Sequence, residues 1–185
     1  MSDALAVGPD GRERCWWAVS APEYVSYHDE EWGRPVRSDR ALYEKLCLEA
    51  FQSGLAWITI LRKREAFRHA FAGFEPEVVA AFGEEDVARL MEDAGIVRNR
   101  AKILAAIANA RASLDVSLAD VVWSFAPPPR PRPRVRADVP AITDESRALA
   151  RELKRRGFKF VGPTTAYALM QACGLVDDHV EGCCV

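Results

Sequence analysis

The sequence predicts an all-α fold, and two observations support that prediction. Apolar residues recur at three- and four-residue spacing along most of the chain, which is the pattern of helices that bury one face. Residue types that begin and end helices stand at the limits of these stretches. No strong pair of strands is present, and the segment 158–161 is too short to build a sheet.

Caps and breakers divide the chain into its expected helices. Ser38 and Asp39 form a typical N-terminal cap, and Thr143 forms another. The helix after Thr143 has acidic residues in its first turn and basic residues in its last, which matches the helix dipole at both ends. Pro163 is well placed at a first helical position. Counted with their limiting residues, the expected helices cover 38–54, 57–71, 84–93, 99–114, 143–157 and 163–174.

Composition limits the class of protein. A chain of 185 residues forms one domain of generous size or two small ones that share a core. Hydrophobic residues make up 49% of it, which argues against a disordered chain. No apolar run approaches the roughly 20 residues of a membrane span, and the polar segment 1–14 lacks the apolar core of a signal peptide. We therefore expect a cytoplasmic protein. The net charge of −2 argues against a nucleic-acid binder that depends on charge alone, although local basic patches are compatible with it.

Proline and arginine alternate in the segment 126–139, which interrupts the helical pattern. Proline removes backbone donors and favours extended chain, so the segment is expected to be a surface loop or linker. Its arginines would be able to contact DNA, but a solvated linker is the favoured interpretation.

Soft metal ligands occur near both ends of the chain. His179 and Cys183 stand in an H-x₃-C spacing, while Cys15 and His28 belong to the N-terminal segment. Together they would form a Cys₂His₂ set, a ligand combination that suits tetrahedral Zn²⁺. In the alternative interpretation, Cys183 belongs to a chance cysteine pair and His28 is an ordinary surface histidine. Five cysteines in a reducing compartment favour thiols or metal ligation over disulfides.

The segment 90–103 has the pattern of a helical hairpin: a helix, a turn at Gly95 and a second helix with basic residues. Glycine permits a tight turn, and free N–H groups at the start of the second helix are able to receive a phosphate. Arg98, Arg100 and Lys102 add positive charge beside the turn. An ordinary helical hairpin with a solvated basic face explains this segment at least as well.

Glu49 lies at the border of the apolar stripe of its helix. Burial of a carboxylate without a partner is costly, so this side chain either reaches solvent or serves a purpose. Flat rings with one carboxylate would suit a planar, cationic ligand that donates hydrogen bonds. From these residues alone, a tryptophan-rich core with a surface glutamate is the favoured interpretation. The polar and aromatic residues that occur nearby in sequence or crowd the N-terminal segment are Gln52, Trp57, Trp16, Trp17, Tyr24, Tyr27 and Trp32.

Several motifs occur in order between residues 14 and 184, which is nearly the whole chain. They are RCWW at 14–17, YHDEEWG at 27–33, CLE at 47–49, GLAWIT at 54–59, DAGI at 93–96, RGFKFVG at 156–162 and MQACGLV at 170–176, followed by His179 and Cys183. In this order they strongly resemble the 3-methyladenine DNA glycosylase I family of constitutive bacterial alkylation-repair enzymes.

The resemblance implies a helix-hairpin-helix DNA glycosylase fold with a zinc site that joins the N- and C-terminal segments. It also implies a helical domain over 34–142 and a terminal zinc-binding domain formed by 1–33 with 143–185, unless the two make one compact unit. Four residues become the ligands of one structural Zn²⁺ ion per chain. They are Cys15, His28, His179 and Cys183.

The resemblance further implies roles in base excision. Glu49 becomes the catalytic carboxylate that recognises the base, Tyr27 and Trp57 stack on the flipped base, and Leu55 helps to fill the gap left in the duplex. The residues expected to bind substrate are Trp17, Tyr24, Tyr27, Gln52 and Trp57, and those expected to contact DNA are Leu55, Gly95, Arg98 and Lys102.

The implied activity is hydrolysis of the N-glycosidic bond of 3-methyladenine in alkylated DNA, with base flipping and an abasic site as product. The expected partner is duplex DNA, and we expect a monomer with neither an obligate protein partner nor a membrane. Two other interpretations stay open: a damage-binding module without turnover, and a zinc-stabilised interaction domain whose tryptophans are only core.

Overall fold

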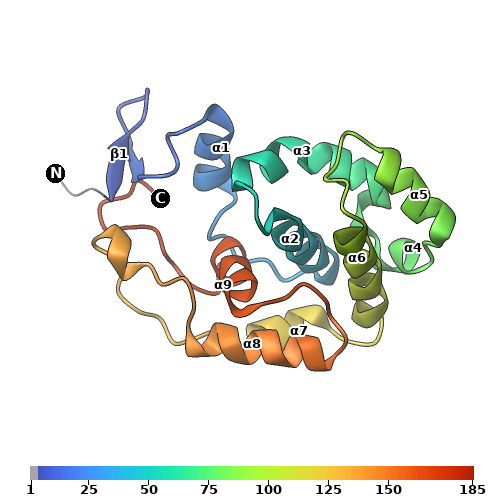
Figure 1. Cartoon of the computed structure of the whole chain (residues 1–185). Helices are drawn as coiled ribbons and strands as arrows, with labels where there is room; N and C mark the ends of the chain where they lie inside the picture. Colours follow the sequence, from blue (N-terminus) through green and yellow to red (C-terminus); the bar gives the residue numbers. More distant parts are fainter. Residues whose placement is uncertain (1–3) are drawn as a thin grey trace.

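The computed structural model describes residues 4–185, and helices form most of it (Figure 1). Within this part of the chain, no helix combines the length and the apolar character that crossing a bilayer requires. The elements in order are β1 (Leu5–Val7), β2 (Glu13–Cys15), α1 (Pro22–Glu30), α2 (Asp39–Gln52), α3 (Trp57–Ala70), η1 (Ala72–Phe74), α4 (Pro76–Ala80), α5 (Glu84–Glu92), α6 (Arg100–Ser113), α7 (Leu118–Trp123), η2 (Arg136–Asp138), α8 (Asp144–Arg155) and α9 (Pro163–Ala172).

The helices expected from the sequence are confirmed, and their caps explain where they begin. Ser38 Oγ accepts from the backbone N–H of Ala41 at 3.4 Å at the start of α2. Thr143 and Ser146 exchange side-chain and backbone hydrogen bonds at the start of α8, with distances of 3.2 and 2.9 Å. Such caps satisfy N–H groups that have no partner within the helix, so short polar residues fix the helix limits locally.

The expectation of an all-α fold is wrong at the N-terminus, where β1 and β2 form an antiparallel ribbon with Leu5 opposite Cys15. Strands of three residues are too short to show an alternating pattern, so the sequence gives no strand signal here. Helices α1, α4 and α7 also lie outside the expected helical segments. They have nine, five and six residues, and so short a helix shows too little of the apolar period to be recognised.

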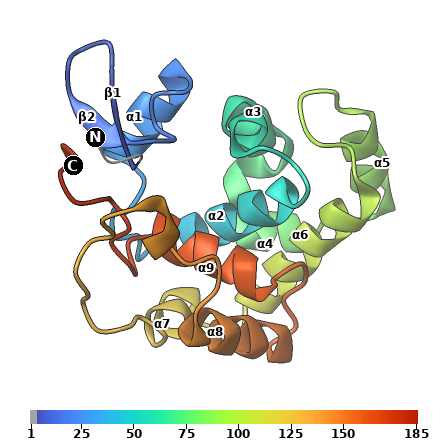
Figure 2. The ribbon, with the colours of Figure 1, turned by 60° about the vertical axis from the view of Figure 1, so that its left-hand side comes forward.

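One hydrophobic core, to which residues from Leu42 to Val176 contribute, holds the helical body together. Helices α2 and α9 lie at its centre, with α8 packed against α9 and α6 packed against α2 and α4 (Figure 1). Helices α8 and α9 therefore share their core with α2, so the domain boundary expected at residue 143 does not coincide with a break in the core. A second, small cluster joins Ala4, Cys15 and Val180. Figure 2 shows the C-terminal segment beside strands β1 and β2.

Candidate active site

A cavity of about 500 Å³ opens between α1, α2, the start of α3 and α9. The family resemblance implied a base-binding pocket formed by Glu49 and five polar or aromatic residues, and all six line this one cavity. They are Trp17, Tyr24, Tyr27, Glu49, Gln52 and Trp57. The other residues that line the cavity are Trp16, Trp32, Ala56, Val139, Ala168, Gln171 and Asp178.

Aromatic rings form the walls of the cavity and support one another. The ring of Trp17 meets those of Tyr24 and Trp32 edge-on, with centroid distances of 5.7 and 5.1 Å. Tyr27 and Trp57 lie 5.6 Å apart in a tilted pair. The hydroxyl of Tyr24 accepts a hydrogen bond of 2.8 Å from the backbone N–H of Ile58, which replaces a side-chain cap at the start of α3. Since each ring is held by another ring or by backbone, the walls are pre-formed.

Two carboxylates line the cavity, those of Glu49 and Asp178, and the carboxylate of Glu49 is the one without a hydrogen-bond partner. Its residue is only 7% exposed, and no hydrogen bond or ion pair to its side chain occurs among residues 4–185. Burial raises the pKa of Glu49 to about 7, although the nearby charge of Lys45 acts in the opposite direction. Nε1 of Trp57 is also buried without a partner in the described chain. The carboxylate of Glu49 is therefore an acceptor that a ligand between the rings could use.

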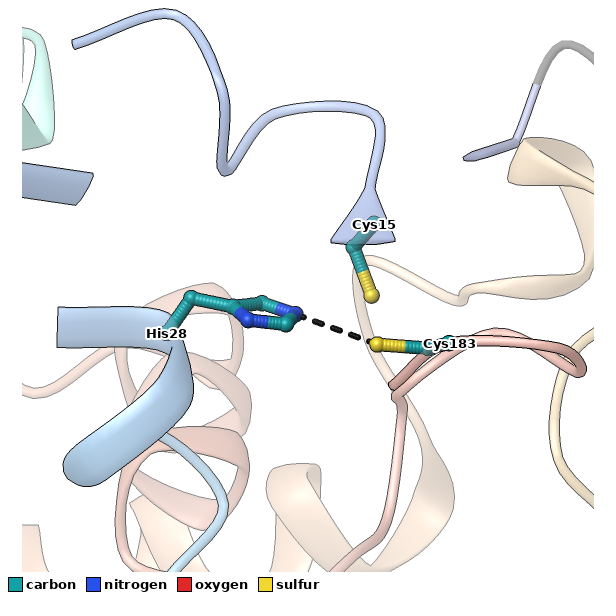
Figure 3. Close-up of side chains that lie close together, drawn as sticks. All are labelled: Cys15, His28 and Cys183. Atoms are coloured by element: carbon teal, nitrogen blue, oxygen red, sulfur yellow. Dashed lines mark hydrogen bonds between the residues drawn. The ribbon is translucent and has the colours of Figure 1, made fainter. Parts of the chain in front are cut away.

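A second cluster brings the two ends of the chain together (Figure 3). The ligand atoms of Cys15, His28 and Cys183 all lie within 4.8 Å of one another and could hold a metal ion. They come from β2, α1 and the C-terminal segment, and Nε2 of His28 lies 3.4 Å from Sγ of Cys183. Contact with the Cys15 thiol and with His28 lowers the pKa of Cys183 well below its ordinary value, which favours the thiolate that binds metals.

Carboxylates hold both histidines of this region in one orientation. Asp29 Oδ1 lies 2.7 Å from His28 Nδ1, and the buried Arg14 donates from Nε to the same carboxylate at 2.9 Å. Asp177 Oδ1 lies 3.0 Å from His179 Nδ1 in the same way. A carboxylate on Nδ1 directs the Nε2 lone pair of each ring outward, as in histidines that bind metals.

His179 lies beside the group of three without being part of it. Its ring centroid is 5.0 Å from that of His28, and burial lowers the pKa of its ring, so the neutral form is favoured. Nε2 of His179 is buried and has no hydrogen-bond partner within residues 4–185. An unpaired buried lone pair next to two thiols and an imidazole fits a tetrahedral, soft metal ion.

The residues expected to contact DNA have different surroundings. Leu55 is 41% exposed in a loop that follows Gly54, whose φ of +82° is a conformation that glycine adopts without strain. Arg98 is exposed. The backbone N–H of Gly95 donates to Asp93 Oδ1 at 2.7 Å, and Lys102 is buried with Nζ donating to two backbone carbonyls. The last two residues therefore already use the donors that were expected to receive phosphate.

From the sequence, a tight turn followed by free N–H groups is expected between α5 and α6. The connection between α8 and α9 has both of these features. Phe160 is 44% exposed and has φ of +55°, which is unusual for a side chain of this size. Asn109 holds the turn by accepting from the N–H of Lys159 at 2.7 Å and donating to its carbonyl at 3.2 Å. Helix α9 has no side-chain cap, and the N–H groups of Gly162 and Thr164 have no acceptor among residues 4–185.

The segment 126–139 is a surface loop, as expected, but three of its arginines also pair with acidic residues of the C-terminal segment. Acidic residues that flank His179 accept from them, and the carbonyl of Pro133 accepts from the N–H of Glu181 at 2.8 Å. These pairings lie about 45 residues or more apart in sequence and leave no local signal. The ion pairs are Arg130 with Asp178, Arg132 with Asp177 and Arg134 with Glu181.

Two polar residues of the cavity were not anticipated from the sequence. Asp178 and Gln171 lie one on the C-terminal segment and one on α9. Both occur close to His179 in the sequence, and Gln171 belongs to the quoted MQACGLV motif. That proximity is the only signal that would have marked them, since the arginine that pairs with Asp178, Arg130, is remote in sequence.

A helical fold around an aromatic cavity with a buried carboxylate defines a class of enzyme that takes up a planar base, and the comparisons agree. The family model for methyladenine glycosylases matches residues 17–185. The chain belongs to this family, whose members hydrolyse N-glycosidic bonds.

Individual relatives match over almost their whole length. The chain is 51% identical over 179 residues to DNA-3-methyladenine glycosylase 1 of Escherichia coli (strain K12), which covers 93% of this chain and 96% of that protein. It is 44% identical over 178 residues to DNA-3-methyladenine glycosylase of Haemophilus influenzae, covering 92% and 96%. A crystal structure of 3-methyladenine DNA glycosylase I superposes with a TM-score of 0.89 at 50% identity, covering 92% and 98%. A Staphylococcus aureus 3-methyladenine DNA glycosylase I structure, which addresses recognition of 3-methyladenine, gives 0.87 at 36%, covering 91% and 93%.

Proposed function

We propose that this protein excises 3-methyladenine from alkylated duplex DNA by flipping the base into the cavity and hydrolysing its N-glycosidic bond. The observation that carries the proposal is Glu49, a buried carboxylate without a protein partner that lines a cavity with aromatic walls. Relatives over the whole chain bear the name DNA-3-methyladenine glycosylase, and structures of two such enzymes share the fold.

The chemistry needs little acid catalysis, because methylation at N3 makes the nucleoside base cationic. The bond between C1′ and the base breaks with its electron pair going to the base, which becomes neutral. Water adds to C1′ and loses a proton, and an abasic site remains. The carboxylate of Glu49 accepts from the exocyclic amine and stabilises positive charge in the cavity.

Selectivity follows from charge and stacking. A flat cation between Tyr27 and Trp57 gains cation–π attraction from both rings, and its charge is balanced by Glu49. Extruding a base costs a few kcal/mol, and the cost is smallest when damage weakens pairing. Normal adenine is neutral and better stacked in the duplex, so it gains less from the cavity and costs more to extract.

The donor set of the terminal cluster supports one Zn²⁺ ion held by Cys15, His28, His179 and Cys183. The thiols and Nε2 of His28 lie within 4.8 Å of one another, and Nε2 of His179 is the buried lone pair that lacks a partner. A zinc ion with four protein ligands supplies folding energy, because no position is left for a reacting water. The ligands join the two ends of the chain and stand outside the chemistry at Glu49.

The DNA is proposed to lie across the mouth of the cavity, and a monomer is sufficient because one chain carries the whole site. Leu55 is exposed and apolar, which suits a side chain that fills the space of a flipped base. The uncapped start of α9, with unpaired N–H groups at Gly162 and Thr164, supports a backbone phosphate contact. Exposed Arg98 supplies charge for a second contact.

The test is release of free bases from methylated duplex DNA. Duplex treated with a methylating agent is incubated with stoichiometric enzyme, and the released bases are separated and identified. The expected result is free 3-methyladenine together with alkali-labile abasic sites. Tight binding to the methylated duplex without base release would instead identify a damage-binding module. Absence of both would leave the zinc-stabilised interaction domain.

A further inference from the structure

A second carboxylate lines the base cavity, and its hydrogen bonds are already filled. Asp178 is 2% exposed and forms an ion pair with Arg130 through Oδ1 at 2.5 Å. Its Oδ2 accepts from the hydroxyl of Tyr167 at 2.6 Å and from Nε2 of Gln171 at 2.8 Å. With three donors on two oxygens, Asp178 has little capacity left to bind a base itself.

These contacts determine how the amide of Gln171 is turned. Nε2 of Gln171 donates to Oδ2 of Asp178, so the amide group that faces Asp178 is the NH₂ group. The carbonyl oxygen Oε1 occupies the other branch of the planar amide and therefore points away from Asp178. Gln171 lines the cavity, and Oε1 has no hydrogen-bond partner among residues 4–185.

The geometry points to Gln171 Oε1 as a second acceptor for the exocyclic amine of the flipped base, with Asp178 as the positioning residue that fixes its orientation. This inference rests on the proposed excision of 3-methyladenine and adds a residue to its recognition. Helices α2 and α9 pack together in the core and present Glu49 and Gln171 to the same cavity. A cationic amine has two N–H donors, so each acceptor takes one.

The pairing also explains why the acceptor is an amide. A second free carboxylate beside Glu49 would repel it and would raise the cost of ionising either group. A neutral oxygen accepts the second N–H without adding charge, and the ion pair between Asp178 and Arg130 keeps the supporting charge compensated. Ala168 and Val139 are apolar neighbours on the same wall and offer no competing side-chain acceptor.

The first experiment measures binding of free 3-methyladenine to the full chain by calorimetry or by quenching of tryptophan fluorescence. Gln171→Met keeps the length of the side chain and removes the acceptor. The expected result is about tenfold weaker binding of 3-methyladenine, as expected for one lost hydrogen bond to a polarised amine. The same substitution should leave unchanged the affinity for 3-methylpurine, which lacks the amine. Unchanged affinity for 3-methyladenine, or an equal loss with both bases, would overturn the inference.

The second experiment tests whether Asp178 acts through Gln171. In Asp178→Asn the new amide is able to donate to Oε1, so the Gln171 amide turns and presents Nε2 to the base. The single variant should lose about as much affinity for 3-methyladenine as Gln171→Met, and the double variant should lose no more. Additive losses would show that Asp178 has only a structural role. Asp178 is next to the proposed zinc ligand His179 in the sequence, so a substitution at Asp178 could also alter metal binding. All variants are therefore dialysed into buffer that contains zinc and compared at equal metal content.

Tyr167→Phe is the matched control. It removes one donor from Asp178 while leaving the bond between Asp178 and Gln171, and Tyr167 does not line the cavity. Its affinity for 3-methyladenine should change less than threefold. The outcomes also distinguish failure of the proposed function from failure of the role proposed for Gln171. A wild type that neither binds 3-methyladenine nor releases it from DNA would overturn the proposed function, whereas a wild type that does both with an indifferent Gln171→Met overturns only the role of Gln171.

Discussion

The base cavity and the terminal cluster each contain buried polar groups without protein partners, yet they are shaped for different occupants. The side chain of Glu49 faces about 500 Å³ of space between aromatic rings. Nε2 of His179 is buried beside three ligand atoms that lie within 4.8 Å of one another. The space in front of the unpaired group therefore distinguishes the site that we propose for a planar base from the site that we propose for a single ion.

The two regions also differ in what stands behind the unpaired group. In the cluster, Asp29 and Asp177 hold the histidine rings, and the ligands themselves connect β2, α1 and the C-terminal segment. Glu49 has no such support and lies within a single helix, α2. Loss of a ligand should therefore weaken the fold first, whereas loss of the Glu49 charge should weaken only the chemistry. Each substitution below tests this contrast.

The largest effect is expected from Glu49→Gln, which keeps the shape of the side chain and removes its charge. Single-turnover release of 3-methyladenine should fall by roughly 10²- to 10³-fold, the usual cost of one lost electrostatic contact to a transition state. Glu77→Gln, which changes an exposed glutamate of α4, is the control and should excise normally. Normal excision by Glu49→Gln would remove Glu49 from the mechanism.

The next effect is on stability and is expected from Cys183→Ser. The zinc content should fall well below one ion per chain, and the melting temperature should drop by roughly 10 °C, as loss of several kcal/mol from a protein of this size would cause. Activity per folded molecule should change little at temperatures below melting. Cys184→Ser alters the neighbouring exposed thiol and should keep both metal and stability. Equal losses in the two variants would argue against the proposed ligand set.

The same contrast explains how much of the molecule was predictable from its sequence. Caps such as Ser38 and Thr143 act within a few residues, so the helix limits were correct. The position of Glu49 at the border of an apolar stripe was also a local signal, but alone it favoured a surface glutamate, and that interpretation is wrong because the residue is buried. The ion pair of Arg130 with Asp178 spans 48 residues and leaves no pattern in either segment, so the pairing of the proline and arginine loop with the C-terminal segment could not be predicted. The amide of Gln171 was missed for the same reason, because its role depends on that pair.

A smaller effect follows from the cost of burying Glu49. Burial raises the pKa of Glu49 from its ordinary value of 4.5 to about 7. The folded chain binds the carboxyl proton of Glu49 more tightly than the unfolded chain does. The contribution of this proton to the free energy of unfolding is therefore complete below pH 4.5 and is lost as the pH rises through about 7. At pH 8, Glu49→Gln should exceed the wild type in unfolding free energy by up to about 3 kcal/mol, and at pH 4.5 by little. Calorimetric melting at both pH values measures this, and a difference that does not vary with pH would contradict it.

The smallest effect distinguishes Arg98 from Lys102, which differ in whether their charge already has a partner. Arg98 is exposed, whereas Nζ of Lys102 donates to the carbonyls of Phe51 and Ser53 at 2.8 and 2.6 Å. Arg98→Ala should weaken duplex binding severalfold and lower the slope of log K against log salt concentration by about 1.

Lys102→Met should leave that slope unchanged and slow excision, because the loop that carries Leu55 begins at the carbonyls that Lys102 holds. Anisotropy titrations between about 50 and 200 mM salt, combined with single-turnover excision, separate the two roles. A lower salt slope in Lys102→Met would mean that its ammonium leaves the carbonyls to meet a phosphate. In that case a buried ammonium that donates to two carbonyls would still be able to contact DNA, and a group would not need to lack a protein partner in order to bind a ligand.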